Sequence, residues 1–161
     1  MQPIIGNQGY DAVVTGLRTK PASKSYVEIT QAHEGENDYL FRLVLANTGF
    51  AYGHSPAIKK GIRRNKRVSI PPQVVTPSEV ARDELDRIVD AARRKEAKNY
   101  PANTSLIIVF DDDLLFRRVM DDTHLDTSIK KNILKLDLRF STLYLVGWHN
   151  VFREFSLATG T

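Results

Sequence analysis

Two carboxylates in neighbouring strand-like segments are the residues of this chain best placed to do chemistry. Asp11 opens the segment Asp11-Ala-Val-Val-Thr15, and Glu28 lies within Tyr26-Val-Glu-Ile-Thr-Gln31. Residues 16–25 between them hold Gly, Pro, Ala, Ser and Lys, a composition that suits a hairpin connection. Paired strands would place the two carboxylates close together. Two such oxygen ligands can hold a Mg²⁺ or Mn²⁺ ion that keeps waters for hydrolysis.

The alternation of side chains along the second strand decides which residues accompany Glu28. Glu28 and Thr30 lie on one face of that strand, and Ile29 and Gln31 lie on the other. The alternative is a plain hairpin in which Asp11 is a turn residue and Glu28 lies on a solvated face.

This arrangement resembles the PD-(D/E)XK, or restriction-endonuclease-like, nuclease superfamily. In that family an Asp opens one strand, and a Glu-x-Lys motif completes the metal site on the next. The resemblance implies that Asp11 and Glu28 are the metal carboxylates, that the Ile29 carbonyl is a further ligand, and that the cofactor is Mg²⁺ or Mn²⁺. It implies a divergent member, because Thr30 stands at the position of the motif lysine.

The lysine of the motif is thought to position the attacking water and to stabilise charge in the transition state. The resemblance therefore places Thr30 and Gln31 in the catalytic site beside the two carboxylates. Gln31, Lys24 or Lys20 could supply the missing function.

A run of basic residues follows the hairpin and is expected to bind nucleic acid, with DNA as the favoured partner. Six cations fall within nine residues, next to the aromatic residues Phe50 and Tyr52. The cations are Lys59, Lys60, Arg63, Arg64, Lys66 and Arg67. Phosphates that neutralise such a cluster release counterions, which gives salt-sensitive affinity without sequence preference. The alternative is a solvated loop whose charges keep the protein in solution.

Asp38 is expected to cap a helix over 39–47, which stops at Asn47-Thr48-Gly49. Nearly every position of that helix is apolar, so we expect it to be buried in the core or at a dimer seam. Residues 57–65 are expected to form a short helical turn, and 67–70 a strand.

A capping box marks the start of the longest predicted helix. Thr76 and Glu79 form the box, Pro77 takes the first helical position, and the helix extends to about Lys98. The short apolar run at 104–110 is rich in β-branched residues, as is typical of a central strand buried on both faces.

Cations gather near the end of this long helix. They are Arg93, Arg94, Lys95 and Lys98. In the nucleases that the chain resembles, a polar residue from the corresponding helix can face the active site. Cations also suit the C-terminal end of a helix dipole, so we expect these four on a solvated outer face.

Three aspartates, Asp111-Asp112-Asp113, follow the predicted central strand. Ligands of α/β proteins collect at the carboxyl ends of parallel strands, so a second metal or phosphoacceptor site is one interpretation. We favour the other, in which they cap a helix over 113–120. A further helix is expected over 127–136, capped by Asp126 or Thr127.

The length and composition indicate one domain over 1–161. A last strand over 141–146 should close its core, with Trp148 and Phe152 packed over it and a loose tail at 156–161. The chain has no cysteine, which excludes disulfides, thiolate zinc sites and cysteine nucleophiles. No signal peptide and no membrane-spanning run is evident, so we expect a cytoplasmic protein without membrane partners.

The order of elements predicts an α/β fold, a three-layer-like sandwich with a mixed central sheet, as in restriction-endonuclease-like proteins. The family core begins with a helix before the first strand, and the ten residues before Asp11 are too few for one. Either the chain is trimmed, or another element or a partner chain covers that face.

These observations are consistent with two main functions. The first is a Mg²⁺-dependent nuclease, an endo- or exodeoxyribonuclease, acting on nucleic-acid phosphodiesters; Asp11 with Glu28 favours it. The second is a catalytically inactive nuclease-fold domain that serves DNA binding or protein assembly, alone or as a homo-oligomer; Thr30 in place of lysine favours it. A plain interaction module without nucleic acid is a third, weaker interpretation.

Overall fold

A six-stranded mixed sheet organises the described part of the chain. The computed structural model describes residues 2–3, 10–16, 23–33, 35–53, 55–60, 67–96 and 98–157. The sheet order is β1-β2-β3-β6-β7-β8. The strands are β1 (Gln2–Pro3), β2 (Ala12–Gly16), β3 (Ser23–Gln31), β6 (Thr104–Phe110), β7 (Thr142–Gly147) and β8 (Phe152–Ser156).

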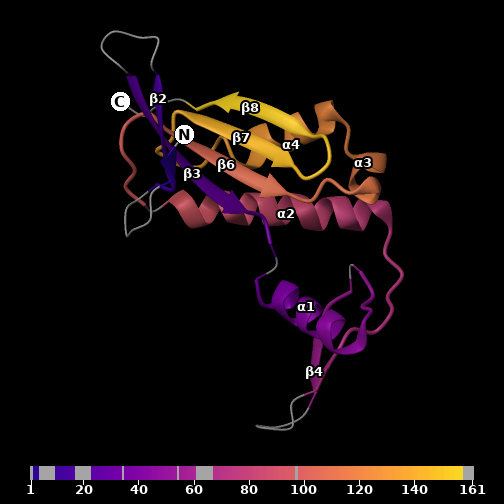
Figure 1. The fold of residues 1–161 in the computed structure, drawn as a ribbon. Helices are drawn as coiled ribbons and strands as arrows, with labels where there is room; N and C mark the ends of the chain where they lie inside the picture. Colours follow the sequence, from indigo (N-terminus) through magenta and orange to yellow (C-terminus); the bar gives the residue numbers. More distant parts are fainter. Residues whose placement is uncertain are drawn as a thin grey trace.

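Parallel pairing is confined to the middle of the sheet. β1, β2 and β3 pair antiparallel, β3, β6 and β7 pair parallel, and β8 returns antiparallel along β7 (Figure 1). The predicted mixed α/β class, with a β-hairpin followed by a helix and a parallel strand, is therefore present.

Helices α2 (Pro77–Glu96), α3 (Leu114–Val119) and α4 (Asp122–Asn132) cover one face of the sheet. Alternate residues of β6 show this: Leu106, Ile108 and Phe110 are fully buried in the core that these helices share. Residues on the other face of β6, such as Ile107 and Val109, are only half-buried. The prediction that this strand is buried on both faces was wrong, and the described residues form two layers rather than three.

Capping residues close in sequence determine where α2 begins and where α1 (Glu36–Thr48) ends. The predicted capping box is confirmed, since Glu79 Oε2 accepts from the N–H and the hydroxyl of Thr76, both at 2.8 Å. α1 ends as predicted at Gly49, whose φ of 77° closes the last turn. Its N-cap is Gly35 rather than Asp38.

The predicted burial of α1 in the core of the domain was wrong, and its place at a dimer seam stays a prediction. Of its residues only Leu40 is buried, while Tyr39, Leu43 and Leu45 are exposed. The apolar composition of this helix therefore does not reflect a place in the core of the domain.

The C-terminal part holds three departures from the prediction. α4 begins at Asp122 and is capped by Asp121, whose side chain accepts from His124 N. β8 was not predicted and pairs along β7. Trp148 and Phe152 are 65% and 58% exposed rather than packed over the core. The tail predicted over 156–161 is described only to residue 157, and 158–161 lie outside the described residues.

A second unit, here called the arm, consists of α1, β4 (Ile58–Lys60), β5 (Arg67–Ser69) and their described connections within residues 36–75. β4 and β5 form a two-stranded antiparallel ribbon, and α1 packs against β5. Figure 1 shows α1 and β4 standing away from the large sheet, below α2 in this view. β4 takes the place of the first part of the helical turn predicted over 57–65, of which 61–65 lie outside the described residues. β5 confirms the strand predicted next to it.

Candidate functional site

The β2–β3 hairpin brings Asp11 to the backbone that carries Glu28. Asp11 N donates to Val27 O at 2.8 Å, and Asp11 Oδ2 accepts from Ile29 N at 2.7 Å. The carboxylate of Asp11 is thus held by the amide directly after Glu28. The register Ala12↔Val27 continues this pairing along both strands. Two acidic residues separated by 17 positions in sequence therefore lie on neighbouring strands at one end of the hairpin.

Glu28 is buried beneath the last turn of α2, where a lysine neutralises it. Lys95 Nζ lies 2.6 Å from Glu28 Oε1, and the two side chains are only 13% and 9% exposed. Tyr100 OH donates to the same oxygen at 3.5 Å. In a buried ion pair, the close contact between the two charges offsets the cost of removing them from water. Removal of one partner leaves the other charge buried without a counter-ion.

Lys95 had been expected on the solvated outer face, and the structure corrects this. α2 buries a stripe that includes Ile88, Ala91 and Ala92, and Lys95 continues that stripe at the next helical spacing. The periodicity of α2 was therefore a signal for Lys95 that the sequence analysis missed. Arg93 and Arg94 are exposed, as expected.

The charges of both carboxylates affect the pKa of the Tyr100 hydroxyl. Burial raises the pKa of Tyr100, and the charge of Glu28, its hydrogen bond and the charge of Asp11 raise it further. Tyr100 is also fixed by its ring, whose centroid lies 4.3 Å from that of Phe140. The phenol therefore remains protonated and acts as a hydrogen-bond donor towards Glu28.

The donor set at the hairpin suits Mg²⁺ or Mn²⁺. Within the described part of the chain, no hydrogen bond engages Asp11 Oδ1 or Glu28 Oε2, so each carboxylate has an oxygen that these residues do not use. No group of three or more His, Cys, Asp or Glu side chains among the described residues is arranged to hold a metal. Mg²⁺ commonly binds one or two carboxylates and completes its shell with water and substrate phosphate, so a two-carboxylate site fits.

The other residues predicted around Glu28 are distributed over both faces of β3. Thr30 shares the face of Glu28, as the pleat predicts, and pairs with Ile108 of β6. Gln31 lies on the opposite face, and its carbonyl accepts from Arg94 at 3.4 Å. Lys24 shares the face of Glu28 but is about 13 Å away along the strand. Lys20 lies outside the described residues.

The predicted basic cluster falls on the arm and is described in part. Lys59 and Lys60 belong to β4, and Arg67 opens β5. Lys59 pairs with Glu36 of α1, and Lys60 stands opposite Arg67. The remaining three predicted cations, Arg63, Arg64 and Lys66, lie outside the described residues.

Two of the three consecutive aspartates have structural roles. Asp112 is fully buried and accepts from the backbone N–H groups of residues 149, 150 and 151 at 2.7–2.9 Å, which holds the turn between β7 and β8. These hydrogen bonds lower the pKa of Asp112 against the opposing effect of burial. Asp113 caps α3 by accepting from Phe116 N at 2.8 Å, which confirms the favoured interpretation.

Asp111 belongs to an acidic cluster at the carboxyl ends of β3 and β6. Glu84 of α2 is 2% exposed, accepts from Asp111 N at 3.0 Å, and pairs with Arg87 at 2.7 Å. Burial raises the pKa of Glu84 to about 7, helped by the charges of Asp111, Asp38 and Asp113. Cavities of about 300 and 260 Å³ adjoin this cluster, between α1 and the sheet edge.

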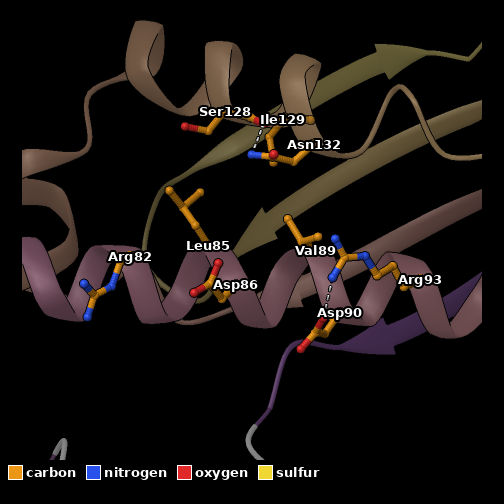
Figure 2. Close-up of a pocket in the computed structure, with 9 residues that line it drawn as sticks. All are labelled: Arg82, Leu85, Asp86, Val89, Asp90, Arg93, Ser128, Ile129 and Asn132. Atoms are coloured by element: carbon orange, nitrogen blue, oxygen red, sulfur yellow. Dashed lines mark hydrogen bonds and ion pairs between the residues drawn. The ribbon is translucent and has the colours of Figure 1, made fainter.

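A separate groove of about 450 Å³ lies between α2 and α4. Figure 2 shows that its walls carry the apolar side chains Leu85, Val89 and Ile129, beside an ion pair between Asp90 and Arg93 at 3.3 Å. No candidate catalytic residue lines it. The residues with candidate chemistry lie at the hairpin rather than in this groove.

Comparison of the chain with protein-family models, with curated proteins and with solved structures finds no match. None of the described helices is long and apolar enough to cross a membrane.

Proposed function

We propose that this protein is a metal-dependent nuclease-like domain that acts on nucleic-acid phosphodiesters. One observation carries the proposal: Asp11 is hydrogen-bonded to the amide next to Glu28, and Lys95 places its ammonium group on Glu28. Two acidic oxygen ligands beside a buried cation are a suitable set for metal-assisted attack on a phosphodiester.

The arrangement of elements supports a restriction-endonuclease-like architecture. The β2–β3 hairpin carries the carboxylates, and α2 leads into β6, which pairs parallel with β3. This is the order of elements that the family resemblance implies. The described residues do not include the helix that precedes the first strand in that family.

Asp11 and Glu28 would hold the Mg²⁺ or Mn²⁺ ion, with the Ile29 carbonyl as a further ligand. When bound, such an ion lowers the pKa of its water and neutralises charge on the phosphate. Lys95 reaches Glu28 from α2 and brings to the site the positive charge that Thr30 lacks. Tyr100 donates its hydroxyl hydrogen to Glu28 and so helps to orient that carboxylate.

The basic cluster of the arm supports a nucleic-acid substrate. Its six cations, Lys59, Lys60, Arg63, Arg64, Lys66 and Arg67, would bind backbone phosphates. The affinity would fall steeply with salt, because phosphate binding releases counterions.

A second candidate is a catalytically inactive domain of the same fold that serves DNA binding or protein assembly. The observation that favours it is the depth of the Glu28–Lys95 pair, since Glu28 is only 7% exposed and already neutralised. In that case the pair stabilises the fold and the arm retains its binding role.

Cleavage of labelled single- and double-stranded DNA in Mg²⁺ or Mn²⁺ separates the two. We expect the intact protein to cleave and Asp11→Asn to lose cleavage while remaining folded. Glu28→Gln should also lose cleavage, with a lower Tm because Lys95 is left without its counter-ion. Asp90→Asn is the matched control, because Asp90 also pairs with a cation on α2 but is 62% exposed and its counter-ion is Arg93 rather than Lys95. An intact protein that neither cleaves nor gains thermal stability from millimolar Mg²⁺ would favour the inactive domain.

A further inference from the structure

The arm exposes aromatic rings that the fold does not use. Tyr39, Phe50 and Tyr52 are 64%, 60% and 46% exposed. Phe50 and Tyr52 touch edge to face, with ring centroids 5.9 Å apart, but neither is buried against the core. Large rings left in solvent lose the stabilisation that burial would provide, so their exposure on one small unit points to a ligand.

The ribbon of the arm places two like charges directly opposite each other. Lys60 of β4 pairs in register with Arg67 of β5, and both are exposed. Neither forms an ion pair with another described residue. Facing cations destabilise a two-stranded ribbon unless an anion lies between them. Lys59, in contrast, has its counter-ion in Glu36.

The positive charge of the chain is concentrated in the stretch of sequence that contains the arm. Residues 36–75 contain seven Lys and Arg but only two Asp and Glu, an excess of five, whereas the entire chain has a net charge of +4. The rest of the protein is therefore slightly acidic. A polyanion would be attracted to the arm in particular, not to the protein surface in general.

We infer that the arm binds single-stranded nucleic acid, with unpaired bases stacked on Phe50, Tyr52 and Tyr39 and with phosphates held between Lys60 and Arg67. Exposed rings can stack on bases only where the bases are unpaired, because a duplex buries its base faces in its own stack. The inference rests on the proposed function for the kind of ligand, and it adds that the substrate is a single strand or an unpaired end.

The test is fluorescence anisotropy with a labelled oligothymidine strand and a blunt duplex of the same length, both in EDTA so that cleavage does not interfere. We expect the single strand to bind more tightly. Phe50→Ala/Tyr52→Ala should weaken single-strand binding about tenfold for each base released, and Phe50→Leu/Tyr52→Leu, which keeps apolar bulk, should weaken it similarly. Phe152→Ala is the matched control, since Phe152 is 58% exposed on β8, outside the arm.

The phosphate contact is tested by the salt dependence of the same binding. Each phosphate contact on a single strand contributes about 0.7 to the slope of log affinity against log salt. Lys60→Gln/Arg67→Gln removes two such contacts and should therefore reduce the magnitude of the slope by about 1.4. Lys130→Gln/Lys131→Gln, on the exposed side of α4, should leave the slope unchanged.

Equal affinity for strand and duplex, no binding by the intact protein, or unchanged binding in the ring variants would each overturn the inference. The outcome is separate from that of the proposed function. Strand binding without cleavage would overturn only the nuclease, and Glu28-dependent cleavage without strand preference would overturn only the role of the arm.

Discussion

Replacing Lys95 with methionine removes the cation of a buried ion pair and retains most of the apolar volume. Lys95 and Glu28 are 13% and 9% exposed and 2.6 Å apart, so the variant leaves a carboxylate under α2 with Tyr100 as its one side-chain donor among the described residues. Loss of one partner of a buried pair costs about 3–5 kcal/mol of unfolding free energy. For a chain of this size each kcal/mol lowers the Tm by about 2–4 °C, so we expect a fall of about 6–20 °C.

Urea and thermal unfolding of Lys95→Met and Arg93→Met would measure this. Arg93 is the matched control, because it lies on the same helix, pairs with Asp90 at 3.3 Å and is 60% exposed. A pair as exposed as this contributes about 0–1 kcal/mol. Adding Glu28→Gln to Lys95→Met should recover part of the loss, because the charge left without a counter-ion is then removed. If Lys95→Met costs no more than Arg93→Met, Lys95 does not lie on Glu28 and the proposed site lacks its cation.

Two further perturbations address the carboxyl end of the sheet. The pKa of Glu84 is raised from 4.5 to about 7, so the folded state binds its proton more tightly than the unfolded state does. Its contribution to stability is therefore fully present below pH 4.5, falls as the pH rises to 7, and amounts to about 3 kcal/mol. Urea unfolding across this range should show a flatter profile for Glu84→Gln than for the intact protein, and parallel profiles would contradict the burial of an ionisable Glu84. Gly147→Ala would place a methyl group 2.6 Å from both carboxylate oxygens of Asp112 and should lower the free energy of unfolding by about 1–3 kcal/mol. Gly53→Ala is the control, because the added methyl group would meet no described atom within 4 Å and should leave stability unchanged. Equal Tm values for the two variants would refute the close approach of Gly147 to Asp112.

Elements governed by neighbours in sequence were predicted correctly. The Thr76–Glu79 capping box and the stop at Gly49 depend on backbone groups within one helical turn. The strand at 104–110 was predicted with its observed limits, because a short apolar run rich in β-branched residues is typical of a buried strand. The hairpin of Asp11 and Glu28 was also found, since its two strands are adjacent along the chain.

Apolar composition alone misled the prediction for α1. Its residues could have been buried in a core or exposed for a ligand, and hydrophobicity does not distinguish the two. The choice depends on whether another element covers the helix, and α1 packs against β5 rather than against the large sheet.

The sequence by itself determined the pair of carboxylates, because a hairpin brings residues together through local pairing. The tertiary structure decided which cation neutralises them. Lys95 is 67 residues from Glu28, and only the packing of α2 across β3 brings the two together, with Tyr100 beside them. The apolar stripe of α2, which includes Ile88 and Ala92, indicates the helix face on which Lys95 lies, but only the packing of that stripe against the core places the ammonium group on Glu28.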